Sequence, residues 1–203
     1  MLDRRTLLTG LIGTGALTLL PLSSASADGP SPEEIFFDPA APVLGNPDGD
    51  VTIVEYFDFQ CGYCKRDYPM VRDVVEQDGN IRLVMKDWPV FGPVSAFAAQ
   101  AVLGAAEIGD YERAIDALML SKGRLSYERV DEILTEAGLN FEEIAASVKK
   151  NDARISALLD RNYRQAEALQ FIGTPSFVIG RTIYPGVLDR PLLEEAVAKA
   201  RAG

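Results

Sequence analysis

The chain contains the segment Val51-Thr52-Ile53-Val54-Glu55-Tyr56-Phe57-Asp58-Phe59-Gln60-Cys61-Gly62-Tyr63-Cys64. The apolar, β-branched run 51–57 predicts a strand, and the pattern after it predicts a helix over about 61–76. A helix that begins at Cys61 places this thiol beside free backbone amides and the positive end of the helix dipole, which favour the thiolate. Cys64 follows one turn later on the same side, where a disulfide can close with little backbone movement. The segment therefore predicts a dithiol redox site.

These are the only two cysteines among 203 residues, and the chain contains no histidine. The lack of histidine excludes Ser-His-Asp and Cys-His catalysis and removes the commonest zinc ligand, so we expect no metal and no cofactor. The formal net charge of −10 argues against nucleic acid and anionic membranes as partners. Because a loop as short as the one between Cys61 and Cys64 constrains an unfolded chain weakly, a purely structural disulfide explains the pair poorly.

Residues 1–27 have the features of a cleavable export signal. Arg4 and Arg5 precede an apolar stretch over 7–22, and the segment ends in Ala25-Ser26-Ala27. The two arginines resemble a twin-arginine signal. A membrane anchor is the competing interpretation, but the stretch is short for a bilayer span and is interrupted by glycines. We therefore expect an exported protein that lacks its first 27 residues.

The rest of the chain predicts an α/β protein. Residues 28–50 form an N-terminal extension with a short edge strand at Glu34-Ile35-Phe36-Phe37, and a second confident strand follows at 81–88. The strand signal then disappears until a hairpin built from 176–179 and 182–184, after which Pro191 begins a last helix that runs to about Ala202. Between the strands, helical spacing predicts five helices, at about 95–108, 111–121, 126–137, 141–150 and 152–169.

Three segments together resemble the DsbA-like thiol:disulfide oxidoreductases of bacterial periplasms: Gly45-Asn46-Pro47, residues 54–64, and Gly173-Thr174-Pro175-Ser176-Phe177. The resemblance spans essentially the whole mature chain and implies a thioredoxin-like fold with an inserted helical domain. In that arrangement residues 51–93 form the first half of the fold, 94–172 the helical insertion and 173–203 the second half. It also implies a periplasmic location.

The resemblance further assigns roles to single residues. It implies a cis peptide bond before Pro175, beside the cysteines, and pairing of the Thr174 backbone with an extended substrate segment. Gly62-Tyr63 replaces the Pro-His pair of the most strongly oxidising members, so we expect a less extreme thiolate.

Attack on a disulfide requires an accessible thiolate, and this role falls to Cys61, while Cys64 resolves the mixed disulfide. Tyr63 lies inside the motif and is expected to be accessible to substrate. The other aromatic residues near strand ends, Phe59, Trp88 and Phe91, are candidates for an apolar rim that contacts unfolded substrates, but aromatic residues at strand ends are usually core and we expect them there. Lys65 and Arg66 are expected to be exposed, with a minor effect on the thiolate.

Glu55 alternates with Ile53 and Phe57, which places it inward beneath the cysteines. A buried carboxyl group has a raised pKa and is able to carry the proton that Cys64 must lose, as the acidic residue of similar proteins does. A solvated edge carboxylate is the alternative. Lys86, near the end of the second strand, is expected to pair with Glu55 across the sheet.

These features predict a monomeric protein disulfide oxidase that acts on reduced, unfolded exported proteins through Cys61 and Cys64. By resemblance, a quinone-linked membrane oxidase would reoxidise it. Two alternatives stay open. In the first alternative the protein is a reductase or an isomerase, which the threonine before Pro175 favours. In the second it is a chaperone or a Cu(I) carrier on the same fold, because a pair of thiolates selects Cu(I).

Overall fold

A computed structural model describes residues 29–203. The expected export signal at residues 1–27 lies outside the described residues and stays a prediction. Five strands form one mixed sheet in the order β1-β3-β2-β4-β5. The neighbours β2 and β3 run parallel, as strands joined by a crossover helix do, and the other neighbouring pairs are antiparallel. The strands are β1 (Val43–Gly45), β2 (Val51–Phe57), β3 (Ile81–Asp87), β4 (Ser176–Ile179) and β5 (Thr182–Pro185).

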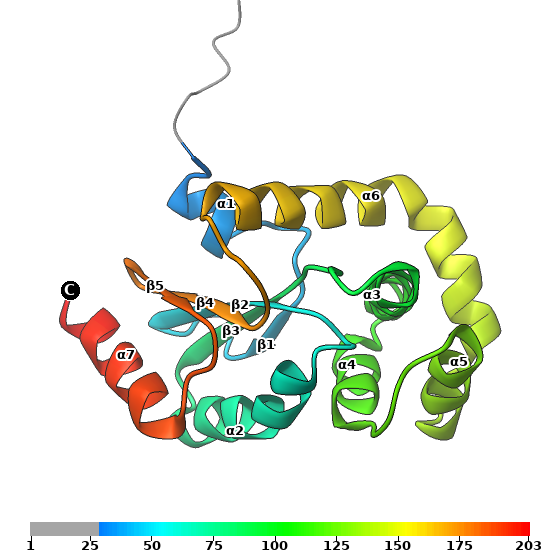
Figure 1. The fold of residues 1–203 in the computed structure, drawn as a ribbon, viewed down its shortest axis with the longest axis horizontal. Helices are drawn as coiled ribbons and strands as arrows, with labels where there is room; N and C mark the ends of the chain where they lie inside the picture. The colour runs from blue at the N-terminus through cyan, green and yellow to red at the C-terminus, as the bar shows by residue number, and fades with distance from the viewer. Residues whose placement is uncertain (1–28) are drawn as a thin grey trace, which may run out of the picture.

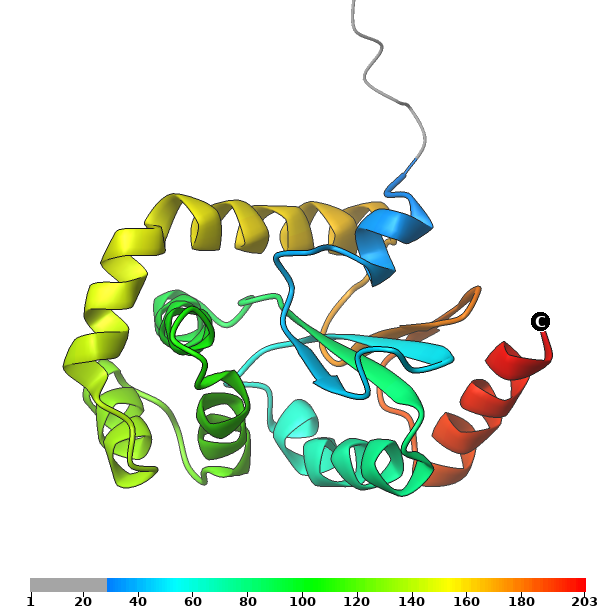
Figure 2. The same cartoon turned by 180° about the vertical axis from the view of Figure 1, so that it is seen from behind.

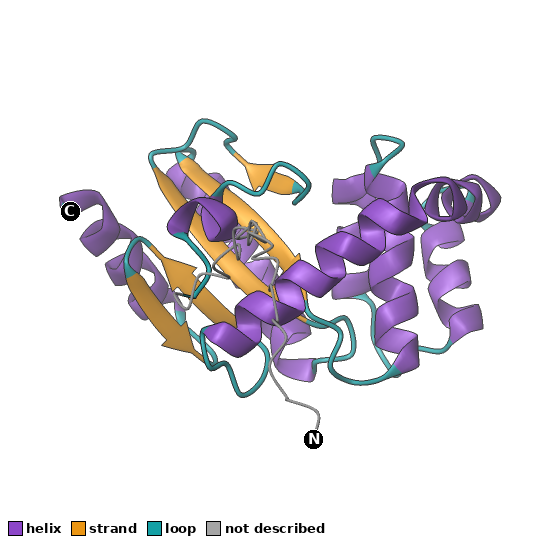
Figure 3. Ribbon diagram, turned by 90° about the horizontal axis from the view of Figure 1, so that it is seen from above, coloured by secondary structure: helices purple, strands orange, loops and turns teal. Residues whose placement is uncertain are grey.

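Helices cover both faces of this sheet (Figure 1). One face lies under α1 and the C-terminal part of α6, and the other lies against α2 and α7. The remaining helices, α3, α4 and α5, stand beside the sheet as a separate block, which Figure 3 shows from above. The described helices are α1 (Pro32–Phe36), α2 (Gly62–Asp78), α3 (Pro93–Ala106), α4 (Tyr111–Leu120), α5 (Tyr127–Glu136), α6 (Phe141–Ala168) and α7 (Arg190–Ala202).

The central strand β2 has the predicted bounds and is buried on both faces. Ile53 and Phe57 belong to the core cluster shared with α2 and the helical block. Val54 and Tyr56 point the other way, into the cluster beneath α1 and α6. Burial on both faces explains why the strand is a continuous apolar run rather than an alternating one.

The helix after β2 begins one residue later than predicted, because Cys61 keeps an extended backbone and occupies the N-cap position. Gly79, with a left-handed φ of 71°, ends the helix, and its amide donates to the carbonyl of Val75 over 3.1 Å. Tyr68 and Val71 are buried against the core. The sequence of β2 and α2 thus delivers both cysteines to the carboxyl end of the central strand.

Four helices, not five, separate β3 from β4. The prediction of separate helices at 141–150 and 152–169 was wrong, because α6 is continuous from its N-cap Asn140 to Ala168. The polar stretch at 149–152 suggested a break, but it contains no glycine or proline to end a helix. Figure 2 shows that α6 instead bends as it passes from the helical block to the sheet.

The edge strand predicted at 34–37 was also wrong, because these residues lie in and just after helix α1. Ser31 and Glu34 form a capping box, with a hydrogen bond of 3.2 Å from the Glu34 amide to the Ser31 hydroxyl and one of 2.8 Å in return. The edge strand is β1 instead, and Gly45 ends it with a φ of 69°. A Cβ atom there would lie 2.6 Å from the carbonyl oxygen of Ile81, so the position requires glycine.

The hairpin of β4 and β5 turns at Gly180-Arg181 as predicted, and α7 starts with Pro191 in its first turn. No helix within residues 29–203 combines the length and the apolar character needed to cross a bilayer. The limits expected for the inserted helical domain stay predictions.

Candidate active site

Cys61 lies where the carboxyl end of β2 meets the amino end of α2. Its Sγ accepts a hydrogen bond from the backbone amide of Cys64 over 3.3 Å. Its thiol donates to the carbonyl oxygen of Thr174 over 3.2 Å, from a residue 113 positions later in the chain. Both cysteines are free thiols. The sulfur of Cys61 is therefore held between the start of a helix and the loop that leads into β4.

The peptide bond between Thr174 and Pro175 is cis, as the family resemblance implied. This loop is held in place because β4 pairs with β2, with Ser176 opposite Tyr56. The Ser176 hydroxyl also donates to the carbonyl of Gly173 over 2.7 Å. The Thr174 backbone consequently faces the redox pair from the neighbouring strand.

The two thiols differ strongly in acidity. The pKa of Cys61 is lowered to about 6, chiefly by a hydrogen bond from the Cys64 thiol and further by the backbone amides of Cys64 and Tyr63, while burial acts in the opposite direction. Burial raises the pKa of Cys64 far above its ordinary value. At neutral pH the reduced site thus holds one thiolate, at Cys61, and one protonated thiol.

The expectation of an exposed nucleophile was wrong, because Cys61 exposes only 3% of its surface. The Thr174 carbonyl and the first turn of α2 cover the sulfur. The sequence placed Cys61 at the start of a helix, which is usually a surface position. Thr174, which covers it, comes from the other half of the fold and could not be anticipated from the sequence around Cys61.

Glu55 is fully buried in β2, on the face of the sheet that carries Ile53 and Phe57. Neither carboxyl oxygen has a hydrogen-bond partner among the described residues. Burial raises the pKa of Glu55 to about 8, and the charges of Asp67 and Cys61 add to this effect. The predicted buried acid beneath the cysteines is therefore present, and the alternative of a solvated edge carboxylate is wrong.

Lys86 does not pair with Glu55. The parallel register of β2 and β3 places Glu55 opposite Met85 and Tyr56 opposite Lys86, so the lysine points to the other face of the sheet. There its amine donates to the carbonyl of Glu34 over 3.2 Å and to Oε1 of Gln165 over 3.0 Å. Burial lowers the pKa of Lys86 to about 8. The residue fastens α1 and α6 to the sheet.

Large apolar side chains lie exposed around the covered sulfur. Tyr63 is 58% exposed, which agrees with its predicted accessibility, and Ile172, two residues before Thr174, is 99% exposed. Phe91 is 55% exposed, so its predicted place in the core was wrong, whereas Phe59 and Trp88 are buried as predicted. Tyr63 lies between the two cysteines in the chain and Ile172 precedes the loop that contacts Cys61, so apolar side chains are exposed on both segments that hold the sulfur.

The two cations after the motif make local contacts. Lys65, predicted to be exposed, is half-buried and donates to the hydroxyl of Ser121 over 2.8 Å, which ties α2 to the helical block. Arg66 is exposed, lies over the ring of Tyr63 and pairs with Asp67 over 2.8 Å.

Sequence reasoning gave Asp58 no role, yet its buried carboxylate accepts four hydrogen bonds around the site. Its donors are the amides of Gln60, Val90 and Phe91 and the hydroxyl of Ser95. An acidic residue three positions before Cys61, at the end of an apolar strand, was the available signal. Its partners come from a later loop and could not be read from the sequence.

A family model described as Thioredoxin matches residues 38–199. The chain belongs to the thioredoxin family. Its fold is also that of solved relatives: a thioredoxin-like oxidoreductase from Silicibacter pomeroyi DSS-3 is 40% identical, with a TM-score of 0.82 over 86% of this chain and 99% of that one.

Two further solved structures are similar to this thioredoxin-family chain. The thiol-disulfide exchange protein alpha-DsbA2 from Wolbachia pipientis is 26% identical, with a TM-score of 0.77 over 82% of this chain and 90% of that one. The catalytic domain of Proteus mirabilis ScsC is 28% identical, with a TM-score of 0.75 over 84% of this chain and 94% of that one. The chain thus has the thioredoxin fold, and the solved structures it is similar to include thiol-disulfide exchange proteins of the DsbA and ScsC kind.

Curated relatives of this thioredoxin-family chain include Na(+)/H(+) antiporters named NhaA. One from Salinispora arenicola is 28% identical over 163 residues, which are 79% of this chain and 25% of the relative. The chain therefore spans about a quarter of the length of the curated relatives it matches.

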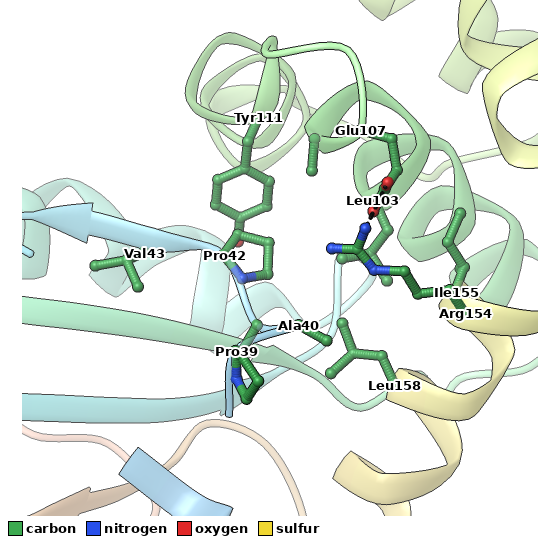
Figure 4. A pocket seen from close by; sticks show the side chains of 12 residues that line it. Pro39, Ala40, Pro42, Val43, Leu103, Glu107, Tyr111, Arg154, Ile155 and Leu158 are labelled. Atoms are coloured by element: carbon green, nitrogen blue, oxygen red, sulfur yellow. Dashed lines mark hydrogen bonds and ion pairs between the residues drawn. The ribbon is translucent and has the colours of Figure 1, made fainter. Parts of the chain in front are cut away.

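A cavity of about 440 Å³ lies on another part of the molecule, between the segment before β1 and the helices α3 and α6 (Figure 4). An ion pair between Arg154 and Glu107, 2.9 Å long, crosses its wall. None of the predicted site residues lines it. The chemistry of the cysteines therefore does not use this cavity.

Proposed function

We propose that this chain is an exported protein disulfide oxidase. The observation that carries the proposal is the contrast between the two thiols, with the pKa of Cys61 lowered to about 6 and that of Cys64 raised. Stabilising the Cys61 thiolate stabilises the reduced form of the pair, and a dithiol that is stable when reduced makes a strong oxidant of its disulfide. The export signal expected at residues 1–27 supports a periplasmic place of action, where disulfides persist.

The reaction transfers two electrons from a substrate dithiol to the Cys61–Cys64 disulfide. A substrate thiolate attacks Sγ of Cys61, the disulfide breaks, and Cys64 leaves with the electron pair and takes up a proton. The second substrate thiolate then attacks the substrate sulfur of the mixed disulfide, and Cys61 leaves as a thiolate. The low pKa of Cys61 makes it a good leaving group in this last step.

Glu55 supplies the proton that Cys64 takes up, and it accepts that proton again when the pair is reoxidised. With a pKa of about 8 its carboxyl group holds a proton at neutral pH, and it lies close enough for its charge to raise the pKa of Cys64. Glu55 and Cys64 are both buried, so we assign this exchange to the carboxyl group rather than to bulk water.

The substrates are reduced, unfolded polypeptides. An extended segment would pair with the Thr174 backbone, which lies 3.2 Å from the sulfur of Cys61, and rest on the exposed side chains of Tyr63 and Ile172. Reoxidation of the pair requires a second partner, for which we propose a quinone-linked membrane oxidase.

Oxidation of reduced, unfolded ribonuclease tests the proposal. We expect the oxidised protein to introduce disulfides in stoichiometric amounts, and the Cys61→Ser variant to introduce none above background. Equal yields from the two proteins would refute the oxidase assignment. Equilibration with glutathione distinguishes the reductase alternative, because a reduction potential clearly below that of glutathione would favour it.

A further inference from the structure

We propose that Asp58 is a positioning residue that fixes the loop Val90–Phe91 as a wall of the substrate site, and that this wall gives the protein a preference for cysteines flanked by apolar residues. The proposal rests on the proposed function, since it concerns the polypeptide that reacts at Cys61. Asp58 touches neither sulfur with its carboxylate; it acts through the loop that it holds.

The carboxylate of Asp58 is almost fully enclosed, with 2% of the residue exposed. Its Oδ2 accepts hydrogen bonds from the amides of Val90 over 2.7 Å and Phe91 over 3.0 Å. Its Oδ1 accepts hydrogen bonds from the amide of Gln60 and the hydroxyl of Ser95, both over 2.7 Å. Hydrogen bonds to an ionised acceptor are short and strong, and four of them converge on this one group.

The donors come from three separate segments that meet beside the redox pair. Gln60 directly precedes Cys61, Val90 and Phe91 lie in the β3–α3 loop, and Ser95 lies in the first turn of α3. The salt bridges of the described residues include no cation paired with Asp58. Its charge is therefore held by neutral donors, and its function in the fold is to bind these segments to one another.

The side chain of Gln60 also joins the segment before Cys61 to the β3–α3 loop and to the first turn of α3. Its Nε2 donates to the carbonyl of Phe91 over 3.3 Å and to the hydroxyl of Ser95 over 3.0 Å. Asp58 thus holds the backbone amide of Phe91, and Gln60 holds its carbonyl. These two residues lie three positions and one position before Cys61.

Fixing the backbone at this point matters because the side chains it carries are apolar and exposed. Phe91 is 55% exposed and Val90 is 40% exposed, so both side chains are available to a bound polypeptide. Ile172 stands exposed in the Thr174 loop, which contacts the same sulfur. A substrate segment at Cys61 therefore meets apolar side chains from two loops, and a rigid wall lowers the entropy cost of that contact.

The test uses two dithiol peptides that differ only beside their cysteines, one with leucine and phenylalanine and one with glycine and serine, with glutathione disulfide as the oxidant that regenerates the Cys61–Cys64 disulfide. We expect wild-type protein to oxidise the apolar peptide with the lower KM. In Asp58→Ala, and less so in Asp58→Asn, which keeps one acceptor oxygen, the KM for the apolar peptide should rise by about threefold to tenfold. The kcat and the KM for the polar peptide should change little.

Three controls separate this role from a general loss of structure. Asp38→Asn removes charge from another buried carboxylate, which binds Arg161 and the amide of Ala40, and should leave the peptide preference unchanged. Phe91→Ala should abolish the preference, and adding Asp58→Asn to it should change the KM little further. The pH midpoint for alkylation of Cys61 should stay near 6 in the Asp58 variants.

The proposal would be overturned if Asp58→Asn and Asp58→Ala kept the wild-type preference for the apolar peptide. It would also be overturned if the pH midpoint for alkylation of Cys61 shifted enough in these variants to explain their change in oxidation rate. Equal KM values for the two peptides with wild-type protein would also reject the wall while leaving the oxidase assignment intact. If wild-type protein reacts with glutathione disulfide but oxidises neither peptide, the proposed function fails and this inference fails with it.

Discussion

Glu55 and Lys86 lie on adjacent strands but point to opposite faces of the sheet. The register sets Glu55 beside Met85, and the amine of Lys86 binds Glu34 and Gln165 on the far side. Within residues 29–203 no cation pairs with the buried acid, and its proton is held chiefly by burial, with the charges of Asp67 and Cys61 adding to the effect. The two residues are expected to act independently.

Independent action gives a first prediction. In a single-turnover reaction, Glu55→Gln should slow the formation of the mixed disulfide between substrate and Cys61, because it removes the group that gives a proton to Cys64 as the Cys61–Cys64 disulfide breaks. Lys86→Met should leave that rate unchanged, since its amine contacts neither cysteine nor Glu55. Quenched-flow trapping of the mixed disulfide measures both rates. A double variant whose rate departs from the product of the single effects would show coupling and contradict the opposite-face arrangement.

A second prediction concerns stability and pH. Because the folded pKa of Glu55, about 8, lies above its ordinary value of 4.5, the unfolded chain releases this proton at lower pH than the folded one. The contribution of Glu55 to stability is therefore complete below about pH 4.5 and is lost as pH rises through 8. Glu55→Gln does not titrate, so it should gain on the order of a few kcal/mol relative to wild type at alkaline pH. Urea unfolding at several pH values measures the difference, and parallel pH curves would contradict it.

The third prediction concerns the Cys61 thiolate. Its alkylation by iodoacetamide should follow a midpoint near pH 6 in reduced protein. Cys64→Ala should move that midpoint upward, because the hydrogen bond from the Cys64 thiol is the main cause of the lowered pKa of Cys61. Cys64→Ser is the matched control, since its hydroxyl still donates and should shift the midpoint less. An alanine variant with an unchanged midpoint would assign the low pKa to the backbone amides instead.

A fourth prediction tests the packing of the helical block. Gly104 of α3 lies against α6, where an added Cβ would stand 2.3 Å from Cγ2 of Val148 and 3.1 Å from the carbonyl oxygen of Ile144. Gly104→Ala should therefore destabilise the protein by about 1–3 kcal/mol, as overpacked cores do. The penalty measured by denaturant unfolding should shrink in a Val148→Ala background. A cost equal in both backgrounds would place the strain elsewhere.

The sequence predicted most of the elements that bring the site together. The β2 run, the helix after Cys61 and the β4–β5 hairpin follow local rules of pattern and turn chemistry, and they have the expected places within two residues. The cis bond before Pro175 came from family resemblance alone, because local chemistry favours trans.

The errors occurred where local signals competed. Ile35 and its aromatic neighbours suggested a strand, although the capping box from Ser31 to Glu34 was readable and prevailed. The helices predicted at 141–150 and 152–169 are one helix, because charged residues continue a helix unless glycine or proline intervenes.

The remaining errors concern tertiary structure. The face that Lys86 occupies depends on the register between β2 and β3, and a shift of one residue would have turned it toward Glu55. The four donors of Asp58 include three from residues more than thirty positions away. Relationships of this kind exist only after the chain has folded.

The contact between Cys61 and Thr174 also has a consequence for the order in which the protein matures. Because the carbonyl that covers the sulfur is made 113 residues after it, a growing polypeptide presents its CxxC pair bare for most of its synthesis. Until β4 joins β2, that pair lacks the partner strand, and its thiols are open to exchange with any disulfide nearby. The last thirty residues thus complete the cover over the Cys61 sulfur, and a nascent chain acquires them only at the end of translation.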